Sequence, residues 1–95
     1  MALADNILGR VVTATAGRDK GKRLVITGIE GDEYVLLADG KRRKAQKPKR
    51  KKLRHVRFEP WRIDPALFGD NAADAHLRKA LRALEGKQDT ESEEG

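Results

Sequence analysis

The chain has 95 residues, of which 21 are Lys or Arg and 15 are Asp or Glu, so its formal net charge is +6. It contains no cysteine, which excludes disulfides, thiolate zinc ligands and thiol nucleophiles. No apolar run approaches the length of a membrane span, and the first residues lack the pattern of a secretion signal. We therefore expect a small cytoplasmic protein with no membrane contact, and polyanions are the first partners to consider.

The positive charge is concentrated in one segment. Residues 41–57 carry eleven Lys or Arg and no acidic residue, whereas the rest of the chain sums to −5. Residues 86–95 carry four acidic residues against one lysine and contain no large apolar side chain, a composition that predicts a disordered tail. This tail either keeps the protein soluble or mimics a polyanion and docks on the basic segment until nucleic acid displaces it.

Three short apolar runs, at 8–13, 24–27 and 34–38, predict strands in the N-terminal half. Their lengths, their β-branched residues and the Gly and Asp between them favour strands over helices. Gly31 and the pair Asp39-Gly40 mark tight turns. Residues 53–58 contain a further apolar pattern that would close the sheet, so we expect a mainly β domain with a marginal core.

The loop between the first two runs is rich in glycine and in basic residues. Gly17 and Gly21 bracket Arg18-Asp19-Lys20, a spacing that excludes a Walker phosphate-binding loop. Its backbone amides and cations could face an anion. The alternative is a structural turn whose charges are simply solvated.

Together these segments resemble the KOW motif of large-subunit ribosomal proteins and NusG-type transcription factors. Residues 9–12 and 24–26 match its two strands, and Gly17, Lys20 and Gly21 match its Gly-x-x-Lys-Gly loop. The Tyr-Val-Leu strand and the Lys-rich stretch ending at His55 make the chain similar to the small bacterial KOW proteins, which resemble the L14e/L6e/L27e-type ribosomal proteins. The resemblance covers residues 7–56 and implies an SH3-like barrel, here 1–58, that binds structured RNA without catalysis.

The basic segment 41–57 is the main candidate for contact with RNA. Pro48 and the lack of large apolar residues before Leu53 exclude an internal core strand. Arginines there could bind phosphate in bidentate fashion or stack on bases, and lysines would act as point charges. A nuclear-import-like or merely solubilising run is the alternative. The predicted RNA-binding residues are Arg10, Arg18, Lys20, Lys22, Arg23, Lys41, Arg42, Arg43, Lys44, Lys47, Lys49, Arg50, Lys51, Lys52, Arg54 and Arg57.

Residues 59–69 are rich in aromatic residues and proline, and match no motif. They are either a hydrophobic strap over an open barrel edge or a stacking platform, with Trp61 beside Arg62 as the candidate. Residues 70–85 predict an amphipathic helix, with Asp70 or Asn71 as its cap. Its apolar stripe includes Leu77, Leu81 and Leu84, which either packs on its own domain or binds a protein partner or a second copy.

Nothing in the chain points to catalysis or to a bound cofactor. His55 and His76 are far apart in sequence without nearby Cys, and the only serine lies in the acidic tail. The first hypothesis is a cytoplasmic, non-catalytic RNA-binding protein that acts on ribosomal RNA and has no metal or cofactor. The other two are a protein-interaction module and a DNA-compacting architectural protein.

Overall fold

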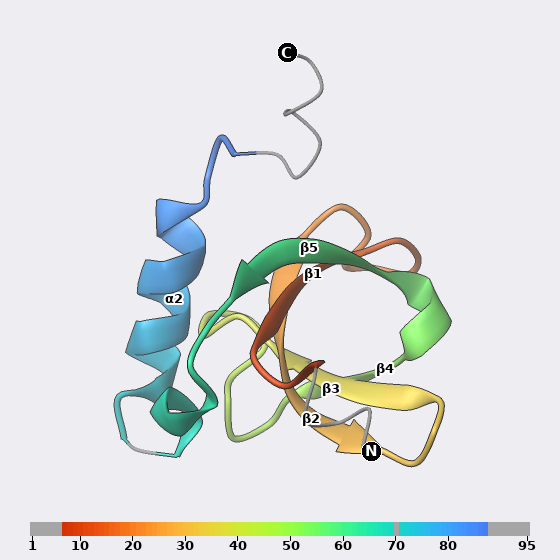
Figure 1. Cartoon of the computed structure of the whole chain (residues 1–95), viewed down its shortest axis with the longest axis horizontal. Helices are drawn as coiled ribbons and strands as arrows, with labels where there is room; N and C mark the ends of the chain where they lie inside the picture. Colours follow the sequence, from red (N-terminus) through yellow and green to blue (C-terminus); the bar gives the residue numbers. More distant parts are fainter. Residues whose placement is uncertain (1–6, 70, 88–95) are drawn as a thin grey trace.

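The computed structural model describes residues 7–69 and 71–87. The described elements are β1 (Arg10–Ala14), β2 (Arg23–Glu30), β3 (Tyr34–Ala38), β4 (Lys49–Lys52), η1 (Leu53–His55), β5 (Val56–Arg62), η2 (Pro65–Phe68) and α2 (Ala73–Ala83). The strands form one antiparallel sheet in the order β4-β3-β2-β1-β5. The sheet curls into a small barrel, and α2 lies along its outside (Figure 1). The expectation of a mainly β fold followed by a helix is confirmed.

The central strands are apolar on both faces because each face covers a separate core. In β1, Val12 belongs to the core inside the barrel, whereas its neighbour Val11 belongs to a second core under α2. Strand β2 repeats this pattern, with Leu24 and Ile26 inside and Val25 outside. This alternation follows from the two-residue period of a strand. It explains why the apolar runs are nearly continuous.

The strand boundaries differ from the predicted ones at several places. Strand β3 begins and ends where expected, and β2 is longer because it continues past Gly28, where its register with β3 shifts. Residues 53–55 form the η1 turn, so β5 starts at Val56 and runs through Arg62. The first part of the region expected to be a strap, 59–69, therefore belongs to strand β5. Much of the remainder forms the η2 turn. The acidic tail beyond Lys87 lies outside the described residues.

Strand β4 was not expected from the sequence, since Lys-rich segments have low strand propensity. It pairs with β3 alone, at one end of the strand order, which agrees with the exclusion of a core strand here. Lys51 faces Val35 in this pairing, so its stem lies on the inner side of the sheet. Its Nζ donates to the backbone oxygen of Ala16, 2.9 Å away.

Helix α2 is attached to the barrel near its start, its middle and its end. The Asp74 carboxylate accepts a hydrogen bond from Ala45 N at 2.7 Å, and the Arg78 guanidinium donates to Gly40 O at 2.7 Å. Beyond the last turn, the Arg23 guanidinium donates to Leu84 O at 2.7 Å and also to Lys87 O. A cation at this end also complements the helix dipole.

The apolar stripe of α2 packs on its own domain. Leu77 is fully buried in the second core, and Leu81 and Leu84 pack against that core while partly exposed. Leu77 is therefore not available to a protein partner in this conformation, which corrects that alternative. The expected cap is also corrected: the N-cap is Ala72, without a side-chain bond, and Asp70 lies outside the described residues. This end of the helix is held instead by the buried side chain of Ala73 and by the hydrogen bond from Ala45 N to the Asp74 carboxylate.

Candidate nucleic-acid interface

The glycine-rich loop is a compact turn that depends on its two glycines. Gly17 and Gly21 have φ of 82° and 87°, in the left-handed region that other residues seldom adopt. Gly21 N donates to Ala14 O at 2.8 Å and Lys20 N donates to Gly17 O at 3.2 Å, which closes the loop on itself. Lys20 and Lys22 are left exposed on its surface. The loop is thus a structural turn with exposed lysines, and contact of these lysines with an anion stays a prediction.

Asp19, in the middle of this loop, is one of the few buried polar residues. Its carboxylate is paired with the Arg43 guanidinium at 2.9 Å, with side-chain exposures of 8% and 29% respectively. The Lys51–Ala16 bond ties the same loop to β4. Two predicted RNA contacts, Arg43 and Lys51, thus have internal partners and hold the loop to the basic segment.

We expect Asp19→Asn to lower the free energy of unfolding by about 1.5–3 kcal/mol, since it leaves the half-buried Arg43 without its charge partner. Urea denaturation checks this value. The control is Glu30→Gln, which removes an ion pair to Arg50 whose side chains are 52% and 55% exposed. That loss should stay below about 1 kcal/mol, and equal losses in the two variants would contradict a structural role for the Asp19 pair.

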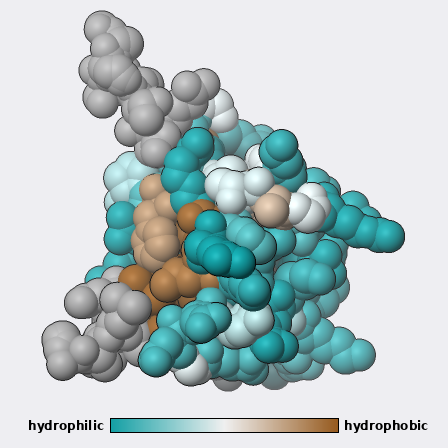
Figure 2. Space-filling view, turned by 90° about the vertical axis from the view of Figure 1, so that its right-hand side faces the viewer, coloured by the Kyte–Doolittle hydropathy of each residue, from teal (hydrophilic) through white to brown (hydrophobic). Residues whose placement is uncertain are grey.

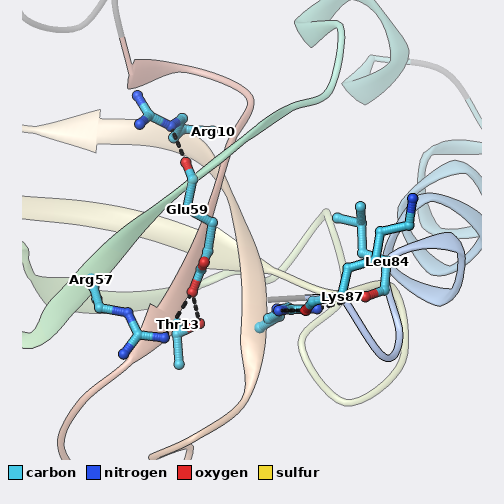
Figure 3. Close-up of polar contacts among 7 residues, drawn as sticks. Arg10, Thr13, Arg57, Glu59, Leu84 and Lys87 are labelled. Carbon is cyan, nitrogen blue, oxygen red and sulfur yellow. Dashed lines mark hydrogen bonds and ion pairs between the residues drawn. The ribbon is translucent and has the colours of Figure 1, made fainter. Parts of the chain in front are cut away.

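Glu59 organises a second set of the predicted cations. Its side chain is fully buried on β5; its Oε2 accepts hydrogen bonds from Thr13 Oγ1 at 2.5 Å and from Arg57 Nη2 at 3.1 Å. Its backbone oxygen accepts from Arg10 Nε at 2.5 Å (Figure 3). Arg10 also lies over the Phe58 ring. These contacts hold β1 to β5. Arg10 and Arg57 therefore stabilise the barrel, whether or not they also contact RNA.

The Trp61 ring is covered by a cation from within the chain. The Arg23 guanidinium carbon lies 4.8 Å from the ring centroid, and the indole packs against the second core. The sequence neighbour Arg62 instead donates to Leu8 O at 3.1 Å. Trp61 and Arg62 therefore make different contacts, because consecutive strand residues point to opposite faces. Stacking of Trp61 on a base stays a prediction.

A groove of about 920 Å³ lies between the barrel and α2. Its lining carries eight basic residues against two acidic ones. The basic residues are Lys22, Arg23, Lys41, Arg42, Arg57, Arg78, Arg82 and Lys87, and the acidic ones are Asp39 and Glu85. Five of the basic residues were predicted as RNA contacts, and the structure brings them together from the loop, the 41–48 connection and β5. We call this cavity the basic groove.

Three basic residues of the groove come after β5 and were not predicted from the sequence. Arg78 and Arg82 lie one turn apart on α2, and Lys87 follows the helix. The four-residue spacing shows that Arg78 and Arg82 share a helix face. The direction of that face depends on how α2 docks, which only the fold supplies.

No family model matches the chain. It is 31% identical over 74 residues to the large ribosomal subunit protein eL14 of Hyperthermus butylicus, an alignment that covers 78% of this chain and 72% of the relative. The chain belongs to the eL14 family. It is also 28% and 29% identical, over 76 residues, to the eL14 proteins of Pyrobaculum islandicum and Pyrobaculum aerophilum, covering 80% of this chain and 71% of each relative. The resemblance to L14e-type ribosomal proteins is thereby confirmed.

The other predicted cations of this eL14-family chain lie outside the basic groove. They include Arg18 and Lys20 on the loop and Lys44, Lys47, Lys49, Lys52 and Arg54 in the basic segment. Arg50, on β4, lies 3.9 Å from the Tyr34 ring centroid and pairs with Glu30. The side of the molecule that carries η1 is largely hydrophilic, with one hydrophobic patch (Figure 2). The basic residues are thus divided between the groove and the surrounding surface.

The described part of this eL14-family chain shows neither a metal site nor a membrane helix. Within residues 7–69 and 71–87, no three His, Asp or Glu side chains are grouped to hold a metal ion. No helix of those residues is long and apolar enough to cross a membrane.

Proposed function

We propose that this eL14-family chain is a non-catalytic, ribosome-associated protein that binds structured ribosomal RNA through its KOW loop and basic segment. The relatives it matches are named large ribosomal subunit proteins. The observation that carries the proposal is the gathering of eight Lys and Arg from four separate parts of the chain on one groove. Phosphate contacts of this kind supply most of the sequence-independent affinity for nucleic acid.

We further propose a division of roles within the chain. The barrel and basic segment form the RNA-binding unit, α2 is a support packed on it, and the protein acts in the cytoplasm. We also propose that the chain is akin to the small bacterial KOW proteins, which its Tyr-Val-Leu strand and Lys-rich stretch resemble. The predicted contacts divide into two groups, since Arg43, Lys51 and Arg10 also hold the fold together. The exposed lysines of the loop and segment are left to contact phosphate.

We expect structured RNA to compete for binding better than duplex DNA of equal phosphate content. We also expect log K against log salt concentration to have a slope of about −3 or steeper, because each phosphate contact releases counterions. Fluorescence anisotropy with a labelled fragment of large-subunit RNA measures both.

Three results separate this proposal from its alternatives. Equal competition by duplex DNA would favour an architectural DNA-binding protein. A partner that survives nuclease and high salt would favour a protein-interaction module. Co-sedimentation with large ribosomal subunits that is lost after nuclease treatment supports the proposal.

A further inference from the structure

The basic groove differs from a small-molecule pocket in its chemistry. Its volume of about 920 Å³ lies near the upper end of the range of roughly 300–1,000 Å³ for ligand sites. Such sites are lined mainly by apolar and aromatic side chains, whereas Leu81 is the one large apolar residue among those that line this groove. The lining therefore suits an extended anion whose charge is distributed along its length.

The basic residues of the groove have two separate roles. Arg23 and Arg78 hold the walls together, since both donate to backbone oxygens across the junction of barrel and helix. Five other basic residues are exposed and form no side-chain hydrogen bond or ion pair to another described residue. These are Lys22, Lys41, Arg42, Arg82 and Lys87.

These five exposed basic residues lie on both walls of the groove. Lys22 follows the loop, Lys41 and Arg42 follow β3, and Arg82 lies on the facing helix. Hydrogen bonds hold the two walls together, so the backbone positions that carry these charges are fixed before a ligand arrives, which lowers the ordering cost of binding. Desolvating five unpaired cations is favourable only for a ligand that brings several negative charges.

We propose that the basic groove is the main RNA-binding site of this protein: it holds the phosphodiester backbone of an RNA strand between the barrel and α2, and the exposed lysines outside it add weaker contacts. The inference rests on the proposed function and deepens it, because it makes α2 a wall of the site and adds Arg82 and Lys87 to the contacts. Because Leu81 is the one large apolar residue of the lining, the groove offers little surface for base stacking, and binding in it depends mainly on phosphate charge.

The sharpest test compares two cations on the same helix. Arg82 and Lys79 are both exposed residues of α2, but only Arg82 lines the groove. Arg82→Glu and Lys79→Glu change the net charge equally, so long-range attraction to RNA falls equally. We expect Arg82→Glu to weaken binding of a labelled large-subunit RNA fragment at least fivefold more than Lys79→Glu.

A second pair tests the opposite wall. Lys41→Glu with Arg42→Glu removes two groove contacts, whereas Lys44→Glu with Lys47→Glu removes two exposed lysines of the same segment that lie outside the groove. We expect the groove pair to weaken binding at least tenfold more than its control. The salt slope should also fall by about 1.4 to 1.8 in magnitude, since each lost contact removes roughly 0.7 to 0.9.

The outcomes separate this inference from the proposed function. Loss of affinity confined to the groove variants, with unchanged circular dichroism and melting temperature, supports the groove. Equal losses in groove and control variants would overturn it while leaving RNA binding established. If the unmodified protein bound no RNA, the proposed function would fall and the groove assignment with it. Should Arg82→Glu unfold, Lys22→Glu on the loop provides the same comparison against Lys20→Glu.

Discussion

Gly40→Ala is expected to destabilise the protein by about 2–5 kcal/mol and to loosen α2 from the barrel. Gly40 has φ of +82°, and a Cβ added there would overlap the backbone carbonyl oxygen of Asp74 in the first turns of α2. The left-handed conformation costs an alanine about 1–2 kcal/mol. Overpacking against helix backbone, which cannot rotate away, adds about 1–3 kcal/mol.

Gly31→Ala is the matched control for this substitution. Gly31 also has positive φ, +65°, but a Cβ there would meet nothing within 4 Å. It should therefore cost only the backbone part, about 1–2 kcal/mol. Urea denaturation gives both values, and proteolysis of the C-terminal third detects release of α2. Equal losses from the two variants would show that the contact between Gly40 and α2 is unimportant.

Leu77→Ala should lower the free energy of unfolding by about 2–5 kcal/mol, because the side chain is fully buried and the substitution leaves a cavity. Leu77 packs with Val11, Val25 and Ile63 in the core between sheet and helix. For a small domain this is a large part of the total stability of about 5–15 kcal/mol. Thermal and urea unfolding, followed by circular dichroism, measure the loss.

Leu84→Ala provides the comparison for Leu77→Ala. Leu84 packs against the same core but is partly exposed and follows the last residue of α2. Its loss should therefore be well below that of Leu77→Ala. The reverse order would mean that α2 is held mainly by its C-terminal end, through Arg23, and not by the second core.

The strands and the loop were predictable because short-range rules govern them. Apolar runs bounded by glycine gave β3 to the residue and β1 and β2 to within a few residues. Gly31 has the positive φ expected of its tight turn. Strand β4 was not predictable, since its four residues are all Lys or Arg and pair only because β3 offers them an edge.

The site was only partly predictable for a related reason. The basic segment identified Lys41 and Arg42, and the loop identified Lys22 and Arg23. The burial of Asp19 against Arg43 could not be predicted, because the two residues are 24 apart in sequence. Arg82 lines the groove because Asp74 and Arg78 hold α2 against the barrel. Such long-range contacts leave no periodic signal in the chain.

The position of β4 at the end of the sheet has a consequence for how copies of the protein behave at high concentration. An open strand edge offers unpaired backbone groups on which a second copy could add its own strand. Strand β4 consists of Lys49, Arg50, Lys51 and Lys52. Pairing two such edges would bring these rows of cations to within about 4.8 Å of each other. The same charges that suit the protein to RNA therefore discourage edge-to-edge aggregation while it is unbound.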